Sequence, residues 1–503
     1  MATITSSAAN NTHVPATNSP AARQRSTQPR PPFASVADVG LSPARVAAGV
    51  EALQGSARSR AETLWIYYRN PMRSTAMGPR SYRLGQERGL PARLVRPPAG
   101  DDRAEPRELV IENDIAWRIG AMVDFLVGKP VRLVSRAPDQ ATRALVETAL
   151  ARVWERSGGL AALQRAALLG HIFGHVDMVV RRRQHEAETA AIADLYVDII
   201  DPRCGRPVTA GPLSALTAPP APAGALADPA SGTAYVIHTA VPGPRAAADD
   251  LQSLTEVITP THRQLYADRG SGPVLIHQER NAVSPGQLPV ARAVNSVGPE
   301  GEPAPGEVEP LIPMQDELNT RLSDRAYRVT LQSFKMLLAK GLAGFDKAPV
   351  GPGMVWATDN PDAAIETFGG DAASPSEDRH IDELREALDK LSGVPPLATG
   401  VVRAKVGNLS SENALRLTLQ GLLARTRRKR VTYGSALLHA SGLILAALHE
   451  SGELPTDTQA RALDLQWPDE LVGDGLDALR EAQAKRELGV PAKAVLTELG
   501  YPQ

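Results

Sequence analysis

Two histidines at the end of an apolar stretch are the first residues to test for chemistry. His171 and His175 lie four residues apart and would share one face of a helix, as paired zinc ligands do. No glutamate follows the first histidine, and Gly174 weakens a helix at this point. We therefore favour a structural pair at a helix-to-strand junction over a zinc enzyme, and we expect no metal and no cofactor.

Other sequence motifs for catalysis are missing. Residues 120–129 end in Gly-Lys-Pro, but they lack the glycine spacing and the Ser or Thr that a P-loop needs. Neither Gly-x-Ser-x-Gly nor Gly-x-Gly-x-x-Gly occurs. The carboxylates show no spacing that pairs an acid with a base. The sequence therefore gives no reason to expect an enzyme.

A long segment without acidic residues carries the most unusual charge pattern. No Asp or Glu occurs between Asn413 and His449, where a helix is expected. Such a basic helix can bind phosphate backbones, or its side chains can pair with acids of neighbouring elements or face solvent. No aromatic residue interrupts the basic run, so stacking on single strands is not expected. The basic residues are Arg416, Arg425, Arg427, Arg428, Lys429 and Arg430.

Composition limits the class of protein. The 503 residues are long enough for two to four domains, and 43% of them are hydrophobic but only 4% aromatic, which favours helices. The net charge of −1 gives no bulk attraction to nucleic acid, and the single Cys204 excludes a disulfide framework. The most apolar stretch, residues 436–448, is shorter than the ~20 residues of a membrane span. We expect no membrane partner.

The elements that would position these residues follow from hydrophobic periodicity and from glycine and proline signals. Residues 1–33 have the composition of a disordered arm, 70–107 of an extended connection and 205–232 of a flexible loop. A Gly/Pro/Glu stretch at 298–306 marks a boundary. Helices are expected at 41–68, 108–126, 139–155, 158–173, 307–341, 376–391, 410–450, 474–487 and 491–499. Strands are expected at 130–134, 176–182, 194–200, 234–240, 254–258, 262–267, 273–280 and 463–467.

The helix expected over 307–341 is the longest before residue 400. It has one apolar stripe that includes Leu311, Leu318 and Leu322, and a polar remainder of mixed charge. Counted from Pro313 it has about 28 residues, or ~42 Å. A helix with one narrow apolar stripe needs partners on several sides, as a ring of identical subunits would supply.

The order of these segments resembles the portal (connector) proteins of tailed double-stranded DNA phages. Asn113–Leu133 resembles an early helix that leads into a Gly-Lys-Pro-Val strand, and Glu309–Asp324 the start of the portal stem helix. Ser392–Pro395 followed by Asn413–Arg416 resembles the second stem helix, tunnel loop and tunnel helix. Trp467-Pro468 and the last helices, to Tyr501, resemble the crown. The resemblance covers about residues 40–503, and only the order and spacing of the motifs are specific.

The resemblance implies an α+β, mostly helical portal fold that assembles as a ring. The arm 1–33 and the loop 205–232 are not typical of the family and receive no role. The implied parts are a wing at 34–306, a first stem helix at 307–342, a clip at 343–375, a second stem helix at 376–393, a tunnel loop at 394–408, a tunnel helix and wing return at 409–470, and a crown at 471–503.

The resemblance also implies a function and partners. About twelve subunits would form a channel for duplex DNA at one capsid vertex of the virion, after assembly in the bacterial cytoplasm. DNA, the terminase, head-tail adaptor or neck proteins, the major capsid protein and a scaffold protein would be partners. The candidate channel residues are Arg403, Lys405 and Asn408 of the tunnel loop. The alternative is a helical DNA-binding protein that uses the basic helix at 416–430.

Overall fold

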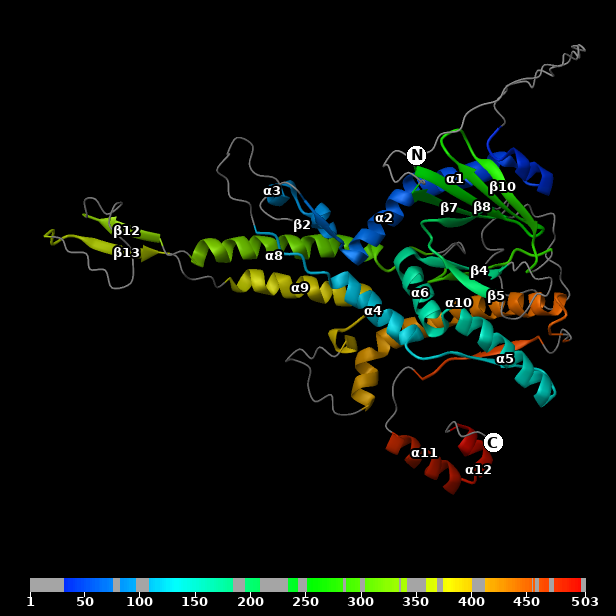
Figure 1. Cartoon of the computed structure of the whole chain (residues 1–503). Helices are drawn as coiled ribbons and strands as arrows, with labels where there is room; N and C mark the ends of the chain where they lie inside the picture. The colour runs from blue at the N-terminus through cyan, green and yellow to red at the C-terminus, as the bar shows by residue number, and fades with distance from the viewer. Residues whose placement is uncertain are drawn as a thin grey trace, which may run out of the picture.

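A computed structural model describes most of the chain (Figure 1). The residues described are 31–75, 82–95, 108–183, 195–208, 234–242, 251–283, 286–298, 304–333, 336–341, 359–368, 374–399, 412–454, 456, 461–469 and 475–498. The expected arm, except for its last three residues, and most of the loop 205–232 lie outside them.

Helices form the frame of the molecule. The α-helices are α1 (Pro43–Gln54), α2 (Ser56–Arg69), α3 (Ala92–Val95), α4 (Asp114–Val127), α5 (Gln140–Arg156), α6 (Gly159–Phe173), α8 (Ile312–Ser333), α9 (Pro375–Ser392), α10 (Glu412–Glu450), α11 (Gly475–Glu487) and α12 (Ala492–Glu498). Short 3-10 helices are η1 (Ala34–Val39), η2 (Gly85–Gly89), η5 (Glu309–Leu311) and η7 (Pro396–Thr399).

The strands in the described ranges form five antiparallel sheets. They are β1 (Met72–Ser74), β2 (Tyr82–Leu84), β3 (Arg132–Ser135), β4 (His175–Arg182), β5 (Leu195–Ile200), β6 (Gly205–Val208), β7 (Ala234–Pro242), β8 (Leu251–Ile258), β9 (His262–Asp268), β10 (Val274–Arg280), β11 (Val290–Val294), β12 (Met336–Lys340), β13 (Ala364–Phe368) and β14 (Leu463–Gln466). The sheet orders are β10-β9-β8-β7-β6, β11-β4-β5, β1-β2, β3-β14 and β12-β13.

The five-stranded sheet is an up-and-down meander covered by α1 (Figure 1). Val46 and Val50 of α1 pack against Val236 and Tyr266 of the sheet. Two expectations need correction here. Phe33, assigned to the arm, is buried with its ring 5.1 Å from that of Tyr266. Residues 205–208, assigned to the loop, pair with β7 as strand β6.

The three-stranded sheet and α10 form the main core. Leu443, Ile444 and Leu448 of α10 lie with the buried residues of β4, β5, β11, α5 and α6. Over Arg416–Glu450, α10 is long and apolar enough to cross a membrane, but 61% of its most apolar window is buried inside the protein. Buried Ser441 accepts a hydrogen bond from the Trp154 indole at 3.2 Å. These contacts are those of a core helix.

Helix α4 begins six residues later than expected. Asn113 is its N-cap, with its side chain accepting a hydrogen bond from the amide of Ala116. Residues 108–113 are not helical, and the backbone amides of Val110 and Glu112 bond to the side chains of Ser323 and Asn319 in α8. Tertiary hydrogen bonds therefore override the helical periodicity of this segment.

Helix α8 ends earlier than expected. It stops at Ser333, and residues 336–340 form strand β12, which pairs with β13 along five residue pairs. A short apolar run is compatible with a helix or with a strand, and here pairing with the antiparallel strand β13 favours the strand. Helix α8 therefore has 22 residues, about 33 Å, and the strands of the expected clip begin before residue 343.

Three other differences are smaller. The helix expected over 41–68 is two helices separated at Gly55. The expected connection at 70–107 contains the β1-β2 pair, η2 and α3. The strand β11, which pairs with β4, was not expected. The remaining expected helices and strands occur with bounds shifted by a few residues.

Gly174, between α6 and β4, gives the first testable prediction. Its φ is +88°, and an added Cβ would lie 2.3 Å from the carbonyl oxygen of Ala304, which crosses the end of α6. Gly270 has a similar φ of +91° but open space around it. Gly270→Ala should cost about 1–2 kcal/mol through its backbone conformation alone. Gly174→Ala should cost about 1–3 kcal/mol more, because of the clash. Equal losses in denaturant unfolding of the two variants would contradict the packing described here.

Candidate functional site

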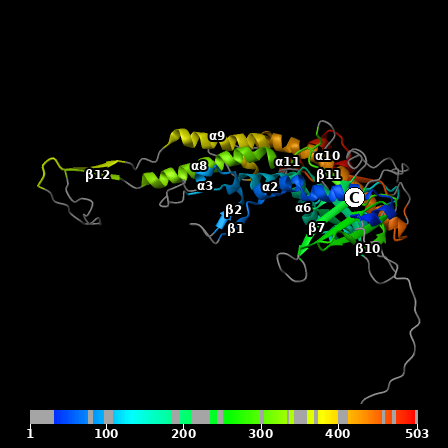
Figure 2. The same ribbon diagram turned by 90° about the horizontal axis from the view of Figure 1, so that it is seen from above.

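Helices α8 and α9 form the most distinctive feature of the molecule. They lie side by side and project from the rest of the molecule, which is called the body below, with the β12-β13 pair beyond their far end (Figures 1 and 2). Leu318 of α8 lies in one buried cluster with Ile381 and Leu388 of α9. Along the exposed part of the pair, Arg325 contacts Asp378 at 3.1 Å and Arg328 contacts Glu377. Exposed ion pairs stabilise little, so the apolar seam holds the two helices together.

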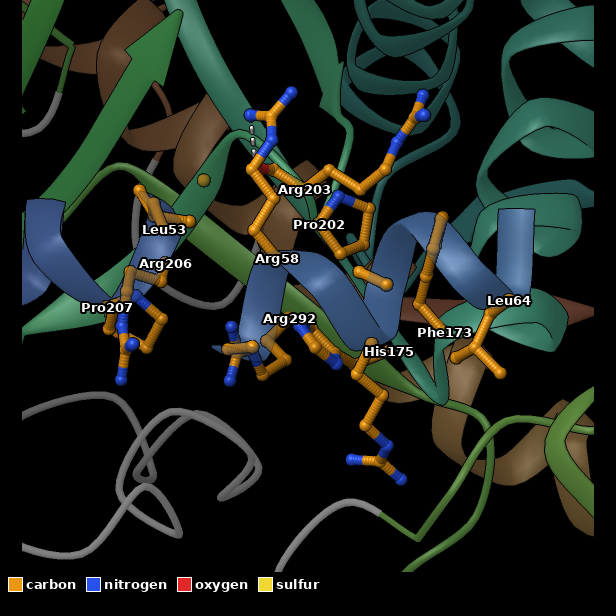
Figure 3. Close-up of a pocket in the computed structure, with 15 residues that line it drawn as sticks. Leu53, Arg58, Leu64, Phe173, His175, Pro202, Arg203, Arg206, Pro207 and Arg292 are labelled. Atoms are coloured by element: carbon orange, nitrogen blue, oxygen red, sulfur yellow. Dashed lines mark hydrogen bonds between the residues drawn. The ribbon is translucent and has the colours of Figure 1, made fainter. Parts of the chain in front are cut away.

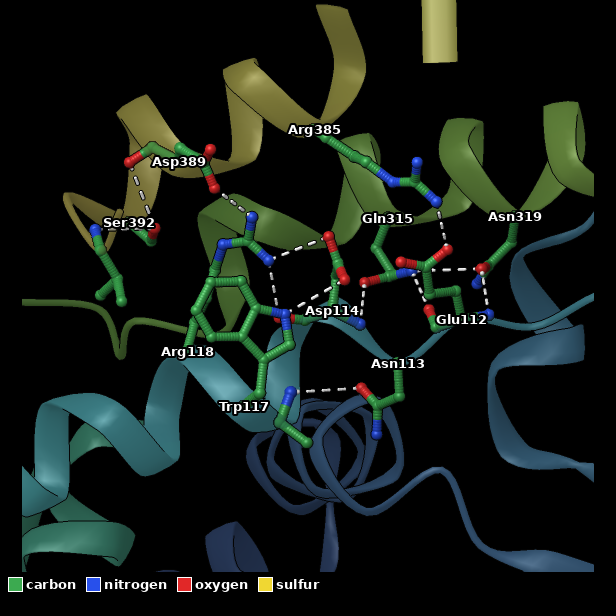
Figure 4. A network of polar contacts seen from close by, with 12 residues as sticks. Glu112, Asn113, Asp114, Trp117, Arg118, Gln315, Asn319, Arg385, Asp389 and Ser392 are labelled. Carbon is green, nitrogen blue, oxygen red and sulfur yellow. Dashed lines mark hydrogen bonds and ion pairs between the residues drawn. The ribbon is translucent and has the colours of Figure 1, made fainter. Parts of the chain in front are cut away.

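A ladder of hydrogen bonds joins α8 to the body. The backbone amides of Val110, Glu112 and Asp114 donate to the side chains of Ser323, Asn319 and Gln315, at 3.0, 3.0 and 3.1 Å. Alternate residues of an extended segment are about 6.6 Å apart, and every fourth residue of a helix about 6.0 Å. The two spacings nearly match, so residues 110–114 lie antiparallel along α8 (Figure 4).

Sequence reasoning did not identify this ladder as a site. Asn319 was expected on the polar face of α8, but Gln315, Asn319 and Ser323 are fully buried. The sequence did contain a signal for their burial. The three residues are uncharged and spaced four residues apart, whereas the charged residues of α8 lie on other faces. The polar face was expected to need neighbouring subunits, yet part of it is covered by this chain's own residues.

Gln86 extends the ladder to α2. Its side-chain amide donates to the carbonyl of Tyr67 at 2.6 Å and to Asn113 at 2.9 Å, and its oxygen accepts from Asn319 at 3.0 Å. Gln86 is completely buried. A buried amide with these partners fixes the positions of α2, α4 and α8 relative to one another.

Arg118 joins α4 to the end of α9. Its guanidinium is completely buried, lies 4.2 Å from the Trp117 ring, and contacts Asp114 at 3.0 Å and Asp389 at 2.5 Å (Figure 4). Arg385 of α9 also contacts Glu112 at 2.7 Å. Helices α8 and α9 are therefore attached to the same short stretch of the body, α8 by backbone amides and α9 by ion pairs.

The basic residues of α10 divide into two groups. Arg425 donates to the carbonyls of Ser392 and Leu391 at the end of α9, at 2.6 and 3.2 Å. Buried Lys429 contacts Glu307 at 2.7 Å, and Arg430 lies 5.3 Å from the Trp467 ring. These three residues contact the body of their own chain. The exposed ones are Arg416, Arg427 and Arg428.

The two histidines differ in exposure: His171 is completely buried, and His175 is partly exposed at the start of β4. His171 lies in the last turn of α6, and its Nδ1 donates to the carbonyl of Ala167 at 2.6 Å, while its Nε2 has no hydrogen-bond partner. Burial and the neighbouring Lys429 lower its pKa to about 3, and burial and Arg292 lower the pKa of His175 to about 4. Within the described ranges, no three His, Cys, Asp or Glu residues gather as a metal site would require.

The candidate channel residues cannot be placed. Arg403, Lys405 and Asn408 lie outside the described residues. The chain on either side of them is described. Gly393 follows α9 as its C-cap with φ +67°, η7 comes next, and the chain is described again from Glu412, the first residue of α10.

Replacing Arg118 tests the attachment of α9 to α4. Arg118→Gln leaves Asp114 and Asp389 without their buried cation and should reduce the free energy of unfolding by about 3–5 kcal/mol. Arg379→Gln on α9, which removes one exposed ion pair with Glu383, is the matched control and should cost less than about 1 kcal/mol. Urea unfolding measures both, and similar losses would contradict the anchoring role of Arg118.

The lowered pKa values of His171 and His175 predict that the stability of the folded chain depends on pH. Their folded-state pKa values lie below the unfolded value of about 6.5, so only the unfolded chain takes up protons as the pH falls below 6.5. Stability should therefore be complete above pH 6.5 and fall toward pH 5, by up to about 1.4 kcal/mol per pH unit for each histidine.

Variants can assign this pH dependence. His171→Asn combined with His175→Asn should reduce the change in unfolding free energy between pH 7 and 5. His238 and His439, whose pKa values burial also lowers, should account for part of the remaining change. His277→Asn, at an exposed position, should not reduce it. An unchanged slope in the double variant would contradict the assignment. Zinc at one ion per chain, lost in the double variant, would show that the pair binds metal.

Comparison with known proteins identifies the family. The family model described as "Phage portal protein, SPP1 Gp6-like" matches residues 227–500. No curated protein matches the chain. A solved structure, "Neck of empty GTA particle computed with C6 symmetry", is similar at 10% identity and a TM-score of 0.37, covering 77% of this chain and 89% of that chain. The TM-score is low, so the assignment rests on the family match, which includes α8, β12, β13, α9 and α10. Members of this family are structural components of the phage virion, and this chain belongs to the phage portal protein family.

Proposed function

We propose that about twelve copies of the chain close into a ring around a channel for duplex DNA at one vertex of the capsid. The projecting α8-α9 pair, with the β12-β13 strands at its far end (Figure 1), is the observation that carries the proposal. The family match spans this whole region. DNA would enter during packaging and leave during ejection through the channel.

The parts of the ring would follow the elements. The body from about residue 34 to 306 would be the wing, and the pairing of β14 with β3 supports including the chain after α10 in it. Helices α8 and α9 would be the stem, and the β12-β13 pair the clip. Residues 394–408 would be the tunnel loop. Helices α11 and α12 would be the crown.

The exposed ends of the molecule would contact other proteins. The β12-β13 pair carries an exposed ion pair between Lys340 and Glu366 at 2.7 Å. We assign it to the terminase during packaging and to the head-tail adaptor or neck proteins afterwards. The major capsid protein and a scaffold protein would contact the wing. The near-zero net charge suits a channel through which DNA must slide, because a strongly basic lumen would retain it.

The alternative of a DNA-binding helix receives less support. Arg425, Lys429 and Arg430 contact their own chain, so α10 does not present all of its basic residues on one free face. A helix of this kind would also bind DNA as a monomer or dimer, with a steep dependence on salt.

Measurement of size tests ring closure. The purified chain has a mass of 53.5 kDa, and a ring of about twelve copies would have a mass of about 640 kDa. Mass photometry and negative-stain images should show closed rings. Monomers or two-fold dimers across a range of protein and salt concentrations would contradict the proposal.

Two double variants test the assignment of the channel. Arg403→Ala with Lys405→Ala should leave rings intact but change the length of packaged DNA, because weak phosphate contacts around the lumen are lost. Arg427→Ala with Arg428→Ala, at exposed positions on α10, should instead weaken the rings. Broken rings in the first variant would show that the tunnel loop is an assembly element and that the lumen lies elsewhere.

A further inference from the structure

A cavity of about 240 Å³ lies between the α1-α2 helices and the sheets (Figure 3). Its apolar walls include Leu53, Leu64 and Phe173. The charged residues that line it come from three parts of the chain: α2, the β5-β6 region and β11. They are Arg58, Arg60, Arg203, Arg206 and Arg292.

All charged residues in the described lining are cationic. Four of the five arginines have a carboxylate partner outside the lining: Arg58 contacts Glu62 at 3.4 Å, Arg60 contacts Glu309, Arg203 contacts Asp201 at 2.7 Å, and Arg292 contacts Asp177 at 2.7 Å. Each of these carboxylates forms an ion pair with one arginine, but none of them is among the residues that line the cavity.

Arg206 is the exception among the five. Within the described part of the chain, no carboxylate contacts its guanidinium, although the side chain is about half-buried in β6. Burial and the neighbouring Arg292 lower its pKa, which is the direction expected for a partly buried cation that lies near another cation. His175, at the same cavity, also experiences the positive charge of Arg292 and Arg206.

We propose that this cavity binds one small oxyanion, of the phosphate or sulfate type, with Arg206 as its principal ligand. Arginine binds such anions through its planar fork of donors, and a partly buried site strengthens the charge-assisted hydrogen bonds. The volume accommodates one such ion with several waters. Arg58 of α2 and Arg292 of β11 line the same cavity, and this inference does not depend on ring formation.

Binding of inorganic phosphate to the full-length chain is the test. Isothermal titration with phosphate, at constant ionic strength maintained with chloride, should show saturable binding, and phosphate should raise the melting temperature. Arg206→Gln should reduce the affinity at least tenfold and remove the thermal shift. Arg269→Gln removes the same charge at an exposed position outside the cavity and should leave both unchanged.

These variants separate a loss of phosphate binding from a loss of folding. Arg206 can be replaced without leaving a carboxylate unpaired, whereas Arg292 cannot, because Asp177 would lose its buried cation. Arg58→Gln provides a second variant, for which a smaller loss of affinity is expected. Equal binding by Arg206→Gln and the wild type, or no binding by the wild type, would overturn the proposal. Competition for phosphate by a 20-base-pair duplex would overturn the assignment to a free ion and assign the site to DNA phosphate.

Discussion

The position of α8 and α9 depends on three hydrogen bonds from an extended segment to one face of α8. The amides of residues 110, 112 and 114 find acceptors at 323, 319 and 315 because a strand and a helix place those residues at nearly the same spacing. The acceptors are uncharged, so they can be buried at low cost once paired. Sliding α8 by one residue would break all three bonds at once, which makes this attachment specific as well as stable.

The other contacts extend from this attachment. Gln86 links it to α2, and Arg118 and Arg385 link the neighbouring residues to α9. Arg425 of α10 holds the carbonyl end of α9, next to the point where the expected tunnel loop begins. Helices α8 and α9 are therefore each fixed at the body, and toward the β12-β13 end each pairs mainly with the other. Such an arrangement suits a projecting arm whose far end contacts other molecules.

The sequence predicted best those parts whose structure depends on local pattern. The meander from β7 to β10 follows from strand periodicity and turns, and α5, α6 and α9 from apolar spacing and capping. It failed where a distant partner decides: residues 108–113 are extended because α8 offers acceptors, and 336–340 are a strand because β13 pairs with them. The division of the α10 cations could not be predicted either, because it depends on which neighbours meet each face. The channel residues Arg403, Lys405 and Asn408 stay a prediction.

The pairing of β14 with β3 has a consequence for biosynthesis. Arg132 lies opposite Gln466, so the two strands are separated by more than three hundred residues of chain. At bacterial rates of about 5–20 residues per second, roughly 15–70 seconds pass between the synthesis of β3 and that of its partner. During this interval the residues of α4, α5, β4 and β11 that pack against α10 lack that part of their native cover. The growing chain therefore exposes apolar surface until α10 has been synthesised.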